Sequence, residues 1–226
     1  DGEFVSAAEA NQFDQDAPAV DKLSMTLVKY TKRTLISKEL LQDTGINILS
    51  HIQYRVGLGW GKTINSLLVA EAETGTQYKR GGSTTAIADG EIEDVVYNSS
   101  LAPYLDSPNL AFVMQPPTFG VIRKISANAR VYGPSGGEFS GQLGQRTLLE
   151  YPVHFTGKAD AIAARAKSVL FGAWENMLYR EGPSLEFLYD PYTRGDYGQD
   201  RLLWFMRWDF ELANALAVGY FEHDLT

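Results

Sequence analysis

Three unlike segments follow one another at the start of the chain, and their order limits the possible folds more than any other feature. Residues 1–22 form a polar arm, residues 23–35 alternate as a strand, and a long helix begins around Ser37. The strand and the helix carry apolar faces, whereas the arm is too acidic and too poor in hydrophobic residues to build a core of its own. We therefore expect the arm to need a partner chain.

Composition indicates a globular protein and excludes several classes of site. The chain has 226 residues, 44% hydrophobic and 12% aromatic, which can fill one large or two small domains. No apolar run approaches the roughly 20 residues of a membrane helix, so we expect a soluble protein without a membrane partner. The absence of cysteine excludes disulfides, thiolate catalysis and cysteine-based zinc sites. Because the chain starts without Met or a signal peptide, we expect a processed or trimmed product.

The formal net charge of −8 bears on nucleic-acid binding. Tight, sequence-independent DNA binding relies on Lys and Arg side chains that displace counterions from the phosphates. A chain with this acidic balance is not expected to bind DNA in that way, although it can still enclose DNA.

Hydrophobic periodicity and turn residues predict a mixed chain of helices and strands. Apolar positions between residues 45 and 71 recur at helical spacing and predict one long helix. Gly57, Gly59 and Gly61 lie inside it, each at a cost on the order of 1 kcal/mol relative to Ala, which implies close packing or a bend. The other expected elements are a helical turn at 37–43, a loop or short hairpin at 74–90, helices at 92–105 and 118–125, and strands at 110–114, 148–155, 168–171, 185–189 and 201–212.

Motifs for catalysis or for cofactor binding are weak throughout the sequence. Residues 57–63 end like a phosphate-binding loop, but Val56 stands where the first glycine is needed and the segment lies within the expected helix. The three histidines have no metal-ligand spacing, and the acidic clusters fall at expected helix or loop ends. We therefore expect no cofactor, no metal site and no enzymatic activity.

Residues 189–198 join two expected strands and place three tyrosines beside an arginine and two aspartates. Tyr and Arg dominate the energetics of protein interfaces, so this segment is more typical of a contact surface than of a solvated turn. A hairpin that merely carries tyrosines remains the alternative. The candidate interface residues are Tyr189, Tyr192, Arg194, Asp196 and Tyr197 in this segment, with Phe4, Phe13 and Lys22 in the arm.

Residues 31–43, with the sequence Thr-Lys-Arg-Thr-Leu-Ile-Ser-Lys-Glu-Leu-Leu-Gln-Asp, pass from a basic strand into a helix. This passage resembles the major capsid proteins of tailed bacteriophages, which have the Hong Kong 97 type of fold. The stretch Phe-Gly-Ala-Trp at 171–174, followed by residues 185–190, is similar to the family's return from its axial domain to its peripheral sheet. The resemblance runs through most of the chain, although the family's N-terminal arm and any scaffolding segment are absent from it.

The resemblance implies an α+β capsid fold with an extended E-loop, a long spine helix, a peripheral domain and an axial domain. Residues 1–35 would be much of the E-loop, which lies over a neighbouring subunit. The peripheral domain with the spine helix would be 36–90, the axial domain 91–170, and 171–226 would return to the peripheral domain with a peripheral loop at 189–198 and the closing strands. A glycine-rich loop at 132–144 would point toward the capsomer centre.

The function that the resemblance implies is that of a shell protein. Copies would self-assemble into pentamers and hexamers of an icosahedral head in the host cytoplasm, where scaffolding, portal and decoration proteins are possible partners and double-stranded DNA is the content of the virion. An encapsulin-type compartment is one alternative. A hydrolytic enzyme at Asp190, Arg194 and Asp196 is another, and it predicts a concave pocket that gathers these three groups.

Overall fold

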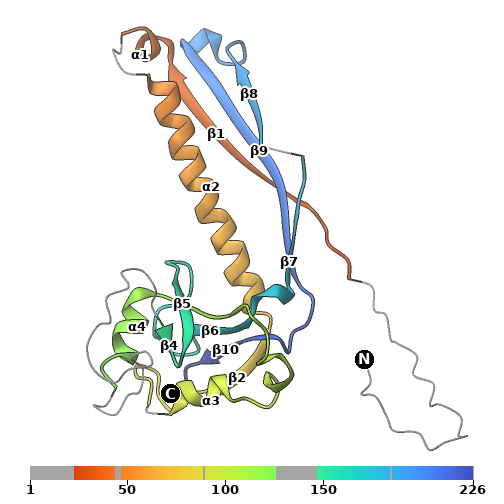
Figure 1. Ribbon diagram of the computed structural model, residues 1–226. Coiled ribbons are helices and arrows are strands. Elements are labelled where there is room, and N and C mark those ends of the chain that lie inside the picture. Colours follow the sequence, from red (N-terminus) through yellow and green to blue (C-terminus); the bar gives the residue numbers. More distant parts are fainter. Residues whose placement is uncertain (1–22, 44–46, 89, 126–146, 184, 226) are drawn as a thin grey trace, which may run out of the picture.

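The computed structural model describes residues 23–43, 47–88, 90–125, 147–183 and 185–225. A long helix and a long sheet run side by side and end on a more compact body that contains a second sheet (Figure 1). The arm at residues 1–22, with Phe4, Phe13 and Lys22, and the glycine-rich loop at 132–144 lie outside the described residues. Among the described helices, none is long and apolar enough to cross a membrane.

The elongated sheet is built around one strand, β9 (Gln199–Leu212). The strand β1 (Val28–Ser37) pairs along one edge of β9, while β7 (Met177–Glu181) and β8 (Glu186–Asp190) follow each other along the opposite edge. All three pairings are antiparallel. Among the described strands of this sheet, β9 pairs with each of the other three, so it forms the centre of the sheet.

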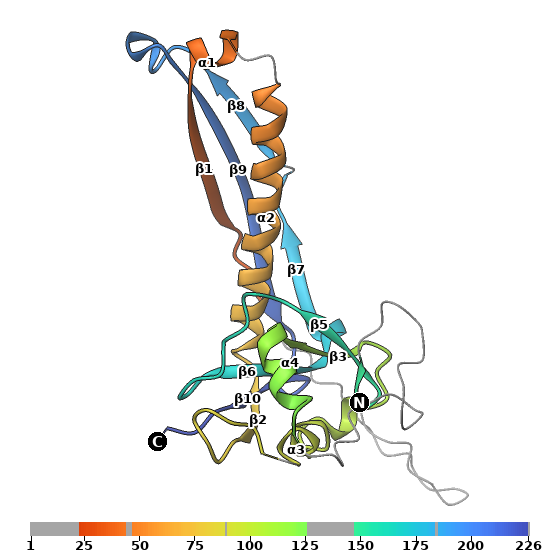
Figure 2. The same ribbon diagram turned by 90° about the vertical axis from the view of Figure 1, so that its left-hand side faces the viewer.

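Helix α2 (Ile48–Ala72) covers one face of this sheet (Figure 2). The short helix α1 (Lys38–Asp43) leads toward it, and the side chain of Asn47 caps α2 by accepting a hydrogen bond from the Ser50 N–H at 3.1 Å. Every second residue of β9 is buried, as a strand with one covered face requires. The buried apolar residues of β9 are Leu202, Trp204, Met206, Trp208, Phe210 and Leu212.

The compact body holds a six-stranded sheet in the order β2-β10-β6-β3-β5-β4. The strands are β2 (Thr76–Arg80), β3 (Leu110–Met114), β4 (Thr147–Leu148), β5 (Tyr151–Phe155), β6 (Lys167–Ala173) and β10 (Val218–Glu222), and the helices are α3 (Glu91–Val96) and α4 (Pro116–Ile122). Strand β3 is buried at all five positions, and its Phe112 stacks on Phe171 of β6 with ring centroids 4.3 Å apart. The main core of the protein therefore lies on this second sheet.

Several expected elements differ from those observed. The strand expected at 23–35 is β1, which starts five residues later and continues to Ser37. The helix expected at 92–105 is wrong beyond Val96, because Asn98 turns inward to donate to the Tyr78 carbonyl at 2.7 Å and Pro103 allows only a short 3-10 helix at Ala102–Tyr104. The hairpin suggested at 74–90 is also wrong, since β2 pairs in parallel with the distant β10.

Two further differences concern strands. The strand expected at 148–155 is divided into β4 and β5, because Leu149 and Glu150 have φ values of 50° and 73° and reverse the chain between them. The strand β7 was not expected, and it lies next to β9 with four of its five residues exposed. Its sequence therefore lacks the alternation that a half-buried strand would show.

The glycines of α2 do not pack against other parts of the chain as expected. Among the described residues, a Cβ atom at Gly57 or Gly61 would meet nothing within 4 Å, and one at Gly59 would meet only the Nζ atom of Lys32, at 3.4 Å. Of the two expectations, close packing or a bend, close packing against the described residues is wrong for Gly57 and Gly61. The helix nevertheless continues through all three glycines.

Candidate functional site

The tyrosine-rich segment forms the tip of the elongated sheet, at the end far from the compact body (Figure 1). It follows β8, passes through a short 3-10 helix at Gly195–Tyr197 and enters β9 at Gln199. Gly198 has a φ of 62°, a conformation that favours glycine. We call residues 190–198 the tip loop.

Asp190 organises the tip loop from its first position. Its carboxylate accepts hydrogen bonds from the backbone N–H groups of Tyr192 and Thr193, each at 3.0 Å, and from the Thr193 hydroxyl. The Arg201 guanidinium donates to the same carboxylate at 2.5 Å. The hydrogen bonds from Thr193, with those from Tyr192 and Arg201, hold the pKa of Asp190 well below its usual range. This carboxylate therefore fixes the turn and is not free to act as a base.

The carboxylate of Asp200 connects the strands beside the tip loop with the start of helix α1. Asp200 is buried, and it accepts a hydrogen bond from the Tyr189 hydroxyl, which raises the pKa of Tyr189. The Nζ atom of Lys38, at the first position of α1, lies 3.8 Å from the other oxygen of Asp200. The Lys38 backbone N–H donates to the Gly198 carbonyl at 2.9 Å. The tip loop is thus held on both sides by contacts within the chain.

The tyrosine side chains of the tip loop are exposed, whereas Arg194 is half-buried. Tyr192 is 89% exposed and Tyr197 is 68% exposed. The Arg194 guanidinium lies over the Tyr197 ring, 5.2 Å from its centroid, and Asp196 is exposed beside them. A rigid loop that presents tyrosine and arginine side chains without covering them has the composition of a protein contact site.

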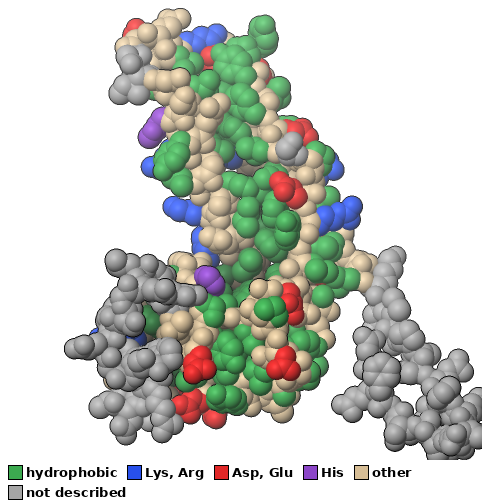
Figure 3. Space-filling view, in the orientation of Figure 1, with side chains coloured by type: hydrophobic (Ala, Val, Ile, Leu, Met, Phe, Trp, Pro, Cys, Tyr) green, Lys and Arg blue, Asp and Glu red, His purple; other side chains and the backbone are tan. Residues whose placement is uncertain are grey.

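Exposed apolar side chains continue from the tip loop along the edge of the sheet. Hydrophobic side chains extend over much of the face shown in Figure 3. Those on β7, β8 and the segment between them that are more than two-fifths exposed are Leu178, Tyr179, Leu185, Phe187, Leu188 and Tyr189. Large exposed apolar areas on a soluble protein mark sites of protein association, so these residues extend the candidate interface beyond the tip loop.

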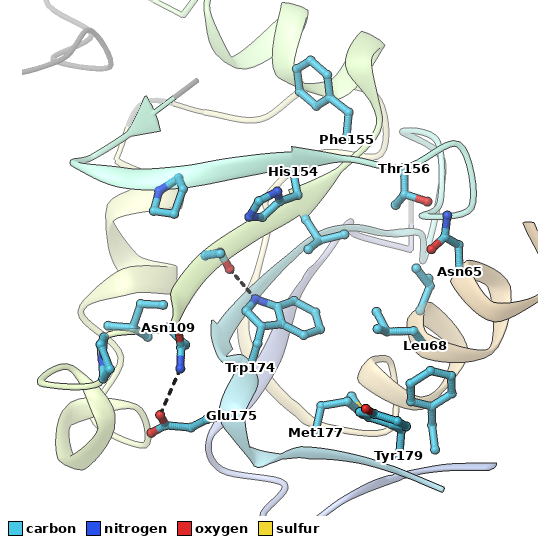
Figure 4. A pocket seen from close by; sticks show the side chains of 17 residues that line it. Asn65, Leu68, Asn109, His154, Phe155, Thr156, Trp174, Glu175, Met177 and Tyr179 are labelled. Atoms are coloured by element: carbon cyan, nitrogen blue, oxygen red, sulfur yellow. Dashed lines mark hydrogen bonds between the residues drawn. The ribbon is translucent and has the colours of Figure 1, made fainter. Parts of the chain in front are cut away.

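A groove of about 600 Å³ lies where the elongated sheet meets the compact body. Figure 4 shows its wall, with Asn65 and Leu68 from α2, His154 from β5 and Trp174 beside β6. Trp174 donates its indole N–H to the Ala111 carbonyl at 2.8 Å, which holds the ring in the wall. The groove is mainly apolar, and its polar groups do not form an arrangement of nucleophile and base.

The enzyme alternative required a concave pocket around Asp190, Arg194 and Asp196. None of these residues lines the groove, nor the second crevice of about 200 Å³ between β1 and α2. In the part of the chain that the structure describes, no group of three or more His, Asp or Glu side chains is placed to hold a metal ion. The geometry therefore gives this alternative no support.

Tyr189, Tyr192, Arg194, Asp196 and Tyr197 lie at one end of the molecule, and their role as interface residues stays a prediction. Sequence reasoning missed the polar groups that hold them there, namely Lys38, Thr193, Asp200 and Arg201. The burial of Asp200 could have been predicted from the sequence, because Asp200 lies two positions before Leu202 and therefore on the same, buried face of β9. The exposed apolar residues of β7 and β8 gave no comparable signal.

Comparisons with known proteins agree with one another. The sequence model of the phage capsid family matches residues 1–222. The structure is similar to the capsid of an empty GTA particle, at 20% identity and a TM-score of 0.78, covering 99% of this chain and 81% of that one. A structure from Gordonia phage Cozz is 11% identical with a TM-score of 0.66, covering 100% of this chain and 80% of that one. A structure from Mycobacterium phage Adephagia is 12% identical with a TM-score of 0.64, covering 89% of this chain and 73% of that one. A search of curated protein sequences found no match.

Proposed function

The chain belongs to the phage capsid family, and on that basis we propose that copies of it associate laterally into the pentamers and hexamers of an icosahedral head. The protein is a structural protein of the phage capsid, with the α+β fold of the Hong Kong 97 type. The family and the compared structures favour a phage head over an encapsulin-type compartment. Double-stranded DNA as content, scaffolding, portal and decoration proteins as partners, and assembly in the host cytoplasm complete the proposal.

The observation that carries the lateral contacts is the set of exposed apolar and tyrosine side chains on β7, β8 and the tip loop. A thin body made of one helix over one sheet leaves these side chains without cover in a single chain. Lateral contacts between different surfaces of identical subunits close into rings when the rotation between them allows closure. The tip loop, rigid before association, would lose little conformational entropy on binding.

We propose a domain division along the two sheets, which moves β2 and β10 from the expected peripheral segments 36–90 and 171–226 to the axial domain. We assign α2 and the sheet around β9 to the peripheral domain, and the six-stranded sheet with α3 and α4 to the axial domain. The expected E-loop at 1–35 is shortened in this proposal, because residues 28–35 pair with β9 as part of β1. Segment 1–27 would then be the part that reaches a neighbouring subunit, where Phe4, Phe13 and Lys22 would contribute contacts.

The tip loop can be tested with Tyr192→Ser and Tyr197→Ser combined in one full-length chain. Both side chains are largely exposed, so the stability of the free subunit should be unchanged, while assembly followed by sedimentation velocity should fall. Interface hot spots cost about 2 kcal/mol or more each, which is at least about thirtyfold in affinity per contact. Tyr97→Ser is the matched control, because Tyr97 is 71% exposed on the compact body. Normal assembly of the double variant, or an equal loss in the control, would exclude the tip loop as an interface.

A further inference from the structure

Charge is unevenly distributed along the chain, and the net value hides this. Residues 1–21 hold six acidic residues and no Lys or Arg, whereas residues 22–70 hold seven Lys or Arg and only two acidic residues. No acidic residue occurs between Ile48 and Ala70, which is nearly all of α2. The elongated part of an acidic protein therefore has a basic element at its centre.

The basic side chains of α2 lie in a line along its outer side. His51, Arg55 and Lys62 follow one another at spacings of four and seven residues, which places them on one face of a helix. All three are exposed, while the opposite face of α2 packs on β9 through residues such as Val56 and Ile64. Figure 3 shows basic and histidine side chains along the edge of the molecule where α2 runs in Figure 1.

A third cation reaches this line from the neighbouring strand. Lys32 of β1 is exposed, and its Nζ atom lies beside the backbone of Gly59, between the levels of Arg55 and Lys62. A side chain at position 59 would contact this ammonium group, so the glycine leaves it room against the helix. We call Lys32, Arg55 and Lys62 the α2 stripe.

No acidic side chain among the described residues forms an ion pair with a cation of the α2 stripe. Among the described residues, the ion pairs use Lys38, Lys79, Arg80 and Arg201 instead. Helices commonly pair a cation with an acidic residue three or four positions away, but α2 offers none to Arg55 or Lys62. Three neighbouring cations that repel one another without an internal partner favour an external anion.

We infer that the α2 stripe contacts the phosphate backbone of double-stranded DNA inside the assembled head, and so that the α2 side of the subunit faces the interior. This inference rests on the proposed function, which supplies the DNA. From Arg55 to Lys62 the stripe covers about 10 Å of helix, and each strand of DNA presents a phosphate every 3.4 Å or so along its axis. Arg55 and Lys62 line neither groove, and contact with phosphates needs a line of cations and no pocket.

The test compares the full-length parent chain with Arg55→Gln combined with Lys62→Gln. Gln has nearly the helix propensity of Arg and Lys, so α2 should remain folded. The matched control, Lys158→Gln with Arg165→Gln, removes the same charge from exposed positions on the compact body. The probe is a labelled DNA duplex of mixed sequence, and its affinity is measured by fluorescence anisotropy over a series of salt concentrations.

The logarithm of the affinity falls with the logarithm of the salt concentration, and each lost phosphate contact should make this slope shallower by about 0.9. The slope of the stripe variant should therefore be shallower than that of the parent by about 1.8, and the slope of the control should be almost unchanged. Equal slopes in the parent and the stripe variant, equal losses in the control, or no duplex binding by the parent at low salt would each overturn the inference. A synthetic peptide of residues 1–21 serves as the competing anion. If the stripe variant loses peptide binding while its duplex slope is unchanged, the stripe docks an acidic protein segment and the DNA assignment is wrong.

Electron microscopy of the same preparations separates this inference from the proposed function. The stripe variant should form the same shells as the parent, because Arg55 and Lys62 are exposed and take part in no ion pair of the described residues. Normal shells with an unchanged salt slope would overturn the DNA contact alone. Failure of the parent to form shells would count against the proposed function, while the salt slope would still report on the stripe.

Discussion

Replacing Leu202 by Ala should destabilise the protein far more than the same replacement one residue later. The Leu202 side chain is fully buried between the sheet and α2, where it belongs to a cluster with Ile36, Val56 and Trp204. Removal of a buried leucine side chain costs about 2–5 kcal/mol, and full burial here suggests about 3 kcal/mol. Leu203 points to the uncovered face and is only partly buried, so Leu203→Ala should cost about 1 kcal/mol or less.

The assay is urea unfolding of the unassembled chain, followed by far-ultraviolet circular dichroism. With a slope of about 3 kcal/mol per molar urea, Leu202→Ala should lower the unfolding midpoint by about 1 M, and Leu203→Ala by a third of that or less. Equal shifts for the two variants would refute the reasoning, because they would mean that α2 does not define a single buried face of β9.

Three further predictions concern local features. The pKa of Asp190 lies below its ordinary 3.8 in the folded protein, so this carboxylate contributes stability that is present above that value and is lost as the pH falls further. Asp190→Asn should therefore lose stability less steeply than the parent when urea midpoints are compared at neutral and strongly acidic pH, and parallel losses would contradict the role assigned to Asp190. Gly57→Ala and Gly61→Ala should each stabilise the free chain by up to about 1 kcal/mol, because the added Cβ would meet none of the described residues within 4 Å. Gly172→Ala should destabilise it, because the new Cβ would lie 2.4 Å from the Ala217 carbonyl oxygen; thermal unfolding of the free chain measures all three, and the opposite sign at any position would contradict the local packing.

The parts of the fold that could be predicted are those determined by local pattern. The strand expected at 201–212 is β9, which begins two residues earlier, and the strand expected at 110–114 is β3 with the same ends. Helix α2 was predicted within three residues at its start and one at its end, because its buried side follows a helical period. The resemblance in residues 31–43 led to the family that the whole chain matches.

The parts that could not be predicted depend on contacts between distant residues. Strand β2 exists because Thr76–Arg80 pairs with β10, about 140 positions later, and nothing in its own sequence reveals that partner. The tip loop residues were identified by type, but the buried Asp200 and the cation of Lys38 hold them in place through tertiary contacts. Whether Tyr192 and Tyr197 contact another subunit stays a prediction.

Cryo-electron microscopy of the purified full-length protein, with scaffolding protein supplied, tests the central claim most directly. Lateral assembly predicts closed shells or capsomer rings in which the tip loop and the exposed side of β7 and β8 lie against neighbouring subunits. The claim of lateral assembly would be contradicted if the protein stayed a compact monomer with scaffolding protein present. Shells in which the tip loop, β7 and β8 remain exposed to solvent would also contradict it.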